Sequence, residues 1–208
     1  MDNTAPDLSP RDLSTPDLSA LIGSRICHDL VSPLGAISNG VELLGMSQPP
    51  SPELALISES VAHALARIRM FRLAFGAVRG EQRISGREIA SILEGLGKGG
   101  KIRFEWSMPT DLPRREAKLL LLLVQCCESA MAWGGVLTLG QAAQGWRLDA
   151  RAPRLRLEPA LWGPLACGTA PADPRPSEVH FALVPPMLEA TGRSLQLETT
   201  EEEIHLAL

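Results

Sequence analysis

Apolar side chains recur at helical spacing through the first third of this 208-residue chain. A first helix is predicted from Asp17, which can cap it, to about Met46. Its apolar positions are four and three residues apart, which is the repeat of a helix-bundle seam. These positions are Leu30, Leu34, Ile37, Val41 and Leu44.

A second helix follows the proline-rich break at 47–52. Ser51 is a good cap, Pro52 suits a first turn, and Gly76 and Gly80 predict its end. Two long helices joined by a short turn indicate an antiparallel hairpin. Because a single hairpin cannot cover both apolar stripes, we expect a second copy of the chain to complete a four-helix bundle, which makes the protein a homodimer.

The pattern changes after residue 80, where shorter helices alternate with strands. Residues 159–176 contain five prolines and predict a loop with at most one helical turn. The expected fold class is therefore α+β: a flexible tail at 1–16, the helical hairpin at 17–80, and an α/β sandwich at 81–208. Helices are predicted at 85–96, 113–132 and 177–191, and strands at 101–108, 135–141, 145–151, 194–200 and 202–208.

Composition narrows the classes of function. The formal net charge of -4 argues against direct binding of nucleic acid. Apolar runs stay below the roughly 18 residues of a membrane span, and the N-terminus lacks the regions of a secretory signal, so we expect a cytoplasmic protein without a membrane association. The four cysteines form no C-x-x-C pair, which argues against a zinc site.

One segment, RICHDLVSPLGAI at 25–37, carries candidate chemistry. At about 100° per residue, His28 lies about 160° from the apolar seam and faces outward. A neutral imidazole on an uncrowded surface suits attack on a phosphoryl group held by another protein. The neighbouring positions on this outer strip are small or polar, and we expect them to contact the partner: Ser24, Ser32, Gly35 and Asn39.

Charged residues surround this candidate. Asp29 is expected to orient the His28 ring or take its second proton, and Arg25 to offset phosphoryl charge. In an antiparallel hairpin the end of the second helix lies level with His28. That end carries three more candidate partner-binding residues: Arg67, Arg69 and Arg72. An exposed helical histidine beside an aspartate is also common on ordinary solvated surfaces, so geometry alone leaves both interpretations open.

The segment also resembles known families. His28 to Leu34, read as His-Asp-Leu-x-x-Pro-Leu, resembles the H-box of histidine kinases, in which the histidine is phosphorylated and the acid assists. More closely, CHDLVSPLGAISNGVELL at 27–44 and RLAFGA at 72–77 resemble the ChpT-type histidine phosphotransferases of alphaproteobacteria. The likeness is sharp over residues 20–77 and architectural beyond them. It implies a dimer, a second domain shaped like a kinase ATPase domain that has lost ATP binding, and a relay between a hybrid histidine kinase and response regulators in cell-cycle control.

The second half can be compared with what a working kinase needs. Gln125 and Ser129 stand where the kinase pattern has asparagines that hold magnesium and phosphates. The segment at 151–176 has no Asp-x-Gly-x-Gly run for adenine, and a glycine-rich lid is missing. The sequence therefore predicts no ATP binding and no stably bound cofactor.

The function predicted from the sequence is a phosphotransferase that shuttles a phosphoryl group between receiver-domain aspartates through His28. Magnesium is expected to come with the receiver. Two alternatives stay open: a non-catalytic dimeric adaptor that binds receivers, and an ATP-dependent histidine kinase. Incorporation of phosphate at His28 distinguishes the transferase from the adaptor, and nucleotide binding distinguishes the kinase.

Overall fold

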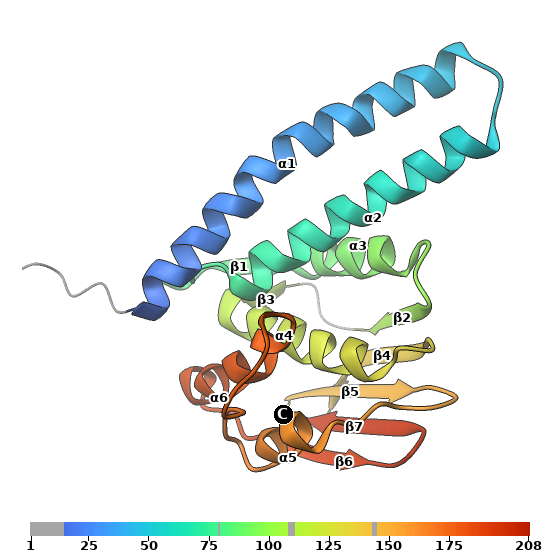
Figure 1. Cartoon of the computed structure of the whole chain (residues 1–208). Coiled ribbons are helices and arrows are strands. Elements are labelled where there is room, and N and C mark those ends of the chain that lie inside the picture. Colours follow the sequence, from blue (N-terminus) through green and yellow to red (C-terminus); the bar gives the residue numbers. More distant parts are fainter. Residues whose placement is uncertain (1–14, 79, 108–110, 143–144) are drawn as a thin grey trace, which may run out of the picture.

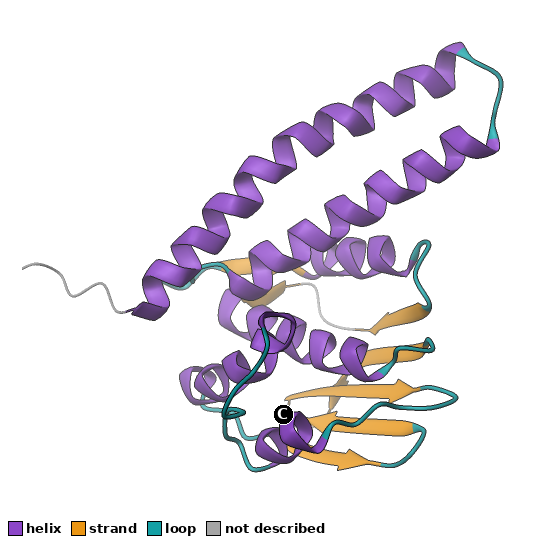
Figure 2. Cartoon of the chain, viewed as in Figure 1, coloured by secondary structure: helices purple, strands orange, loops and turns teal. Residues whose placement is uncertain are grey.

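The computed structural model describes residues 15–78, 80–107, 111–142 and 145–208. Most of the tail predicted at 1–16 lies outside these ranges, as do residue 108 of a predicted strand and residues 143–144 of a predicted hairpin turn. Within them the chain forms helices and a mixed sheet, which confirms the α+β class (Figure 2).

Two long helices form the expected antiparallel hairpin. Helix α1 spans Thr15–Ser47 and α2 spans Pro52–Phe75, and they lie side by side over most of their length (Figure 1). The Ser51 hydroxyl accepts the N–H of Leu54 at 3.1 Å, as an N-cap does, and Gly76 ends α2. A Cβ on Gly76 would lie 2.3 Å from the Arg72 carbonyl, so only glycine fits this close approach.

The second half contains a five-stranded sheet in the order β2-β4-β5-β7-β6. Strands β2 and β4 are parallel, and the other neighbouring pairs are antiparallel. Side chains on one face of the central strands are buried while those on the other face are polar and solvent-accessible, so the helices cover a single face. The strands are β2 Ile102–Ser107, β4 Gly135–Ala142, β5 Gly145–Arg151, β6 Gln196–Thr199 and β7 Glu203–Ala207.

Helix α4, at Arg114–Ala130, is the centre of the core. The run Leu119–Val124 is fully buried because α4 contacts α2 of the hairpin as well as α6 at Val179–Thr191. Helix α3, at Gly86–Gly97, packs against α2 and β2. The hairpin is thus fixed to the second half through its α2 helix, while α1 lies outside (Figure 1).

Three features differ from the sequence-based prediction. Residues 159–166 form a two-turn helix, α5 Pro159–Ala166, rather than a loop, because Pro159 suits a first turn and Leu161, Trp162 and Leu165 are buried. A short antiparallel pair, β1 Arg83–Ser85 with β3 Asp111–Pro113, was not predicted, since three residues are too few to show a period. A single 3-10 turn at Pro176–Glu178 precedes α6.

Candidate functional site

His28 projects from the middle of α1 into solvent. Its side chain is 82% exposed, and Nδ1 lies 3.1 Å from Asp29 Oδ1. Arg25 Nε donates to the other Asp29 oxygen at 2.7 Å. The hydrogen bond with His28, and to a smaller extent the one with Arg25, lowers the pKa of the Asp29 carboxyl. A carboxylate at Nδ1 favours the tautomer that is protonated there, which leaves the lone pair on Nε2, facing away from Asp29.

The outer strip around His28 is narrower than predicted. Ser32 and Asn39 are exposed, and a Cβ on Gly35 would meet no atom within 4 Å, so the surface on this side is open. Ser24 is different: it is half-buried, its hydroxyl donates to the Ala20 carbonyl at 2.9 Å, and it faces the end of α2 at Gly76. The prediction that Ser24 belongs to the open strip was therefore wrong, because α1 is rotated so that this position faces its partner helix.

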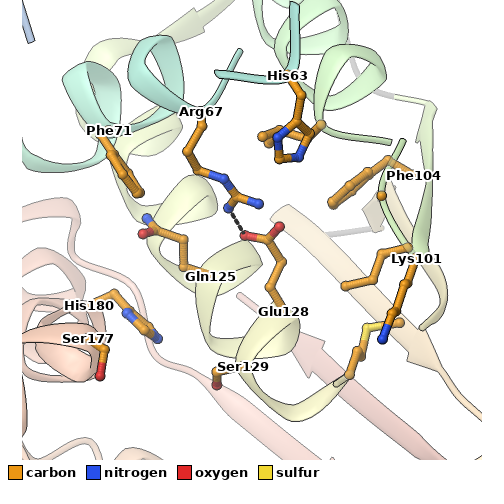
Figure 3. Close-up of a pocket in the computed structure, with 14 residues that line it drawn as sticks. His63, Arg67, Phe71, Lys101, Phe104, Gln125, Glu128, Ser129, Ser177 and His180 are labelled. Carbon is orange, nitrogen blue, oxygen red and sulfur yellow. Dashed lines mark hydrogen bonds and ion pairs between the residues drawn. The ribbon is translucent and has the colours of Figure 1, made fainter. Parts of the chain in front are cut away.

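The three arginines of α2 do not form one cluster. Arg72 lines cavities with Ser24 and with Val31 of α1, which lie on either side of His28, so it is level with His28, as expected. Arg69 and Arg72 line one shallow cavity with Val31 of α1. Arg67 points away from α1 toward the second half, where its guanidinium donates to Glu128 of α4 at 2.8 Å (Figure 3). Expecting Arg67 beside His28 was wrong, since a helix presents residues 67 and 72 in different directions.

The predicted seam of α1 is only partly covered: Leu34 and Val41 are half-buried, but the other three positions are not. Leu30, Ile37 and Leu44 are each about half exposed, whereas Cys27 is buried. Helix α1 therefore packs on α2 with one side, while another side, an apolar stripe extended by Ile22 and Ile26, lies in solvent.

A second cavity, of about 460 Å³, is lined by α2, α4, the start of α6 and the segment that leads into β2. Gln125 and Ser129 line it, but each donates to the backbone of its own helix, at Leu121 and Cys126. The Arg67–Glu128 ion pair crosses the same space (Figure 3). His180 of α6 is buried here, which lowers its pKa to about 4. The polar groups on this face of α4 thus bond to protein.

Sequence reasoning missed two buried cations at the start of α4. Arg114 donates to the Arg72 carbonyl at 3.1 Å and Lys118 to the Gly76 carbonyl at 3.0 Å, so both bond to the C-terminal end of α2. Burial lowers the pKa of Lys118, and of Arg114 to about 10. No local pattern signals these two residues, because arginine and lysine at a helix start are ordinarily solvated.

Metal-ligating side chains are not gathered at this site or elsewhere in the described residues. These residues contain no group of three or more histidine, cysteine, aspartate or glutamate side chains arranged to hold a metal ion. Their helices include none with the length and apolar character of a membrane span.

Comparison with known proteins decides the family. A family model described as the histidine phosphotransferase C-terminal domain matches residues 86–203. This chain belongs to the histidine phosphotransferase family. The protein phosphotransferase ChpT of Brucella abortus (strain 2308) is 32% identical to it over 206 residues, covering 94% of this chain and 96% of that protein. A solved bacterial phosphotransferase, at 30% identity, aligns with a TM-score of 0.63 over 95% of this chain and 98% of its own.

The histidine phosphotransferase assignment confirms the predicted function at the level of the family: the chain is a phosphorelay histidine phosphotransferase. It also corrects the extent of the likeness. The family model matches the second half at the level of sequence, where only architectural similarity was expected.

Proposed function

We propose that His28 is the residue that carries the phosphoryl group. The observation that supports this most directly is its geometry: a solvent-exposed imidazole whose Nδ1 faces the Asp29 carboxylate. A ring held in this way offers Nε2 as a nucleophile at neutral pH. Asp29 is then a positioning residue that sets the tautomer and stabilises the ring when it becomes positively charged.

The proposed reaction has two reversible steps. In the first, His28 Nε2 attacks the phosphorus of an aspartyl phosphate on a receiver domain, the acyl-phosphate P–O bond breaks, and the aspartate carboxylate leaves. In the second, a carboxylate oxygen of an aspartate on another receiver attacks the phosphohistidine, and the N–P bond breaks. Each receiver supplies the magnesium ion that offsets charge on the transferred group. The open surface at Ser32, Gly35 and Asn39 lets a receiver come close.

We further propose that the working unit is a homodimer with a four-helix bundle. The apolar stripe on α1 supports it, because half-exposed leucine and isoleucine side chains in a row are unfavourable in water and self-complementary about a two-fold axis. Transfer without ATP is part of the proposal as well. It is supported by the backbone bonding of Gln125 and Ser129 and by the Arg67–Glu128 pair in that cavity.

The deciding experiment incubates the protein with a panel of phosphorylated receivers and scores acid-labile phosphate on this chain. His28→Ala should abolish phosphate acceptance and leave folding intact, since the side chain is mostly exposed. His63→Ala, on α2, is the matched control and should accept phosphate normally. Asp29→Asn should slow transfer without abolishing it. Phosphate on the His28→Ala variant would overturn the site assignment, and receiver binding without phosphate on wild-type protein would favour the adaptor.

A further inference from the structure

A separate cavity lies where the hairpin meets the second half. Its volume is about 470 Å³, and it opens beside β1 at the C-terminal end of α2. Ser24 of α1 contributes one wall, one helical turn before His28, and Gly76 and Gln82 contribute polar backbone and amide groups. Three arginines also line it: Arg72, Arg83 and Arg114.

The deepest of these arginines has unused hydrogen-bonding capacity. Arg114 is 8% exposed, and one of its terminal nitrogens, Nη2, donates to the Arg72 carbonyl. The other, Nη1, is buried and has no hydrogen-bond partner among the residues that the structure describes. A buried charged donor without an acceptor is unfavourable, and a bound anion or an ordered water in the cavity would satisfy it. Burial, and then the nearby charge of Arg72, lower the pKa of Arg114, because both make its positive charge unfavourable at this position.

Positive charge at the cavity exceeds the negative charge that faces it. Glu88 is the carboxylate among its described lining residues, 3.6 Å from Arg72 and exposed on α3. Arg83 donates to the Asp111 backbone carbonyl rather than to a carboxylate. Lys118 adds a further cation behind Gly76. The C-terminal end of the α2 dipole offsets part of this charge, equivalent to about half an elementary charge, which leaves an excess of positive charge.

We propose that this cavity is a binding site for a small phosphate-type oxyanion. The Arg83 guanidinium would donate to its oxygens, with Arg72 supplying charge at the rim, and Arg114 Nη1 would donate after a small rotation of its side chain toward the cavity. Arginine forks match the tetrahedral oxygens of such a ligand. The site shares Arg72 with the predicted docking surface beside His28, but its donors Arg83 and Arg114 come from β1 and α4, so it does not depend on the phosphotransfer assignment.

The test is a thermal-unfolding titration of the full chain with inorganic phosphate, against chloride at matched ionic strength and pH. Wild-type protein and His28→Ala should both show a saturable rise in melting temperature with phosphate and not with chloride. Arg83→Gln should weaken the apparent affinity about tenfold, the effect of one charge-assisted hydrogen bond. Arg103→Gln, which removes an exposed, ion-paired arginine on β2, is the matched control and should bind as wild type does.

Arg83→Gln is the primary variant because Arg83 is exposed, whereas Arg114→Gln also removes a bond to the end of α2. A parallel titration with glycerol phosphate distinguishes a phosphate ester from the free ion as the ligand. If glycerol phosphate binds more tightly than inorganic phosphate, the site takes an ester. If only inorganic phosphate binds, the site takes the free ion. An equal response to chloride, or an unchanged phosphate response in Arg83→Gln, would overturn the proposal. Loss of the phosphate response in His28→Ala alone would also overturn it, by moving the site to the outer strip.

Discussion

The exposed stripe on α1 gives the prediction with the most structural detail: Ile37→Asp should dissociate the proposed dimer. Ile22, Ile26, Leu30, Ile37 and Leu44 are between 46% and 54% exposed in the single chain. Full burial of such a side chain stabilises by about 2 kcal/mol, so covering the exposed half of each contributes about 1 kcal/mol. Five positions on each of two chains give about 10 kcal/mol of gross stabilisation, enough to offset an association penalty of at least about 4 kcal/mol.

Replacing Ile37 with aspartate removes part of this stabilisation at the centre of the stripe. It removes the apolar contact and places a carboxylate against the partner's apolar side chains, twice in a symmetric dimer. We expect a loss of at least about 4 kcal/mol of association free energy, which raises the dissociation constant about a thousandfold. The fold of each chain should persist, because Ile37 is about half exposed and Cys27 lies on the face that packs on α2.

Light scattering at micromolar concentration measures the outcome, with circular dichroism to confirm folding. Asn39→Asp is the matched control: it adds the same charge to the same helix, two residues away, on the exposed outer strip. We expect a dimer for wild type and for Asn39→Asp, and a folded monomer for Ile37→Asp. A wild-type monomer, or an Ile37→Asp dimer of undiminished affinity, would refute the reasoning from the exposed stripe.

Three further predictions concern the second half and the outer strip. Glu128→Gln should lower the free energy of unfolding by about 2 kcal/mol in urea denaturation, because it leaves Arg67 without its charged acceptor; an unchanged midpoint would contradict this. Burial lowers the pKa of His180 from 6.5 to about 4, so between these pH values the unfolded chain binds more protons than the folded one. The free energy of unfolding should therefore fall by up to about 3 kcal/mol as the pH drops through that window. His180→Phe should remove this pH dependence, which urea denaturation at several pH values would measure. Gly35→Trp should slow transfer from every receiver with an unchanged melting temperature, since a side chain there meets no atom within 4 Å; a lower melting temperature with normal transfer would assign Gly35 to packing instead.

The sequence by itself determined the elements whose signal is local. Ser51 and the proline break fixed where α1 ends and α2 begins, and α6 ends at Gly192, as predicted, with a left-handed backbone. Helix geometry alone places His28 on the side of α1 opposite its apolar stripe, and the structure leaves that side exposed. Motif likeness then identified the family, which the family model and the Brucella protein confirm.

Tertiary structure decided what depends on how elements are rotated against each other. The apolar stripe of α1 faces solvent rather than α2, Ser24 faces the hairpin interior, and Arg67 reaches Glu128. A one-dimensional pattern shows that a helix has an apolar side, but not which neighbour covers it. Arg114 likewise looks like a solvated helix start in sequence. It is buried only because the end of α2, 42 residues earlier in the chain, brings the Arg72 carbonyl to it.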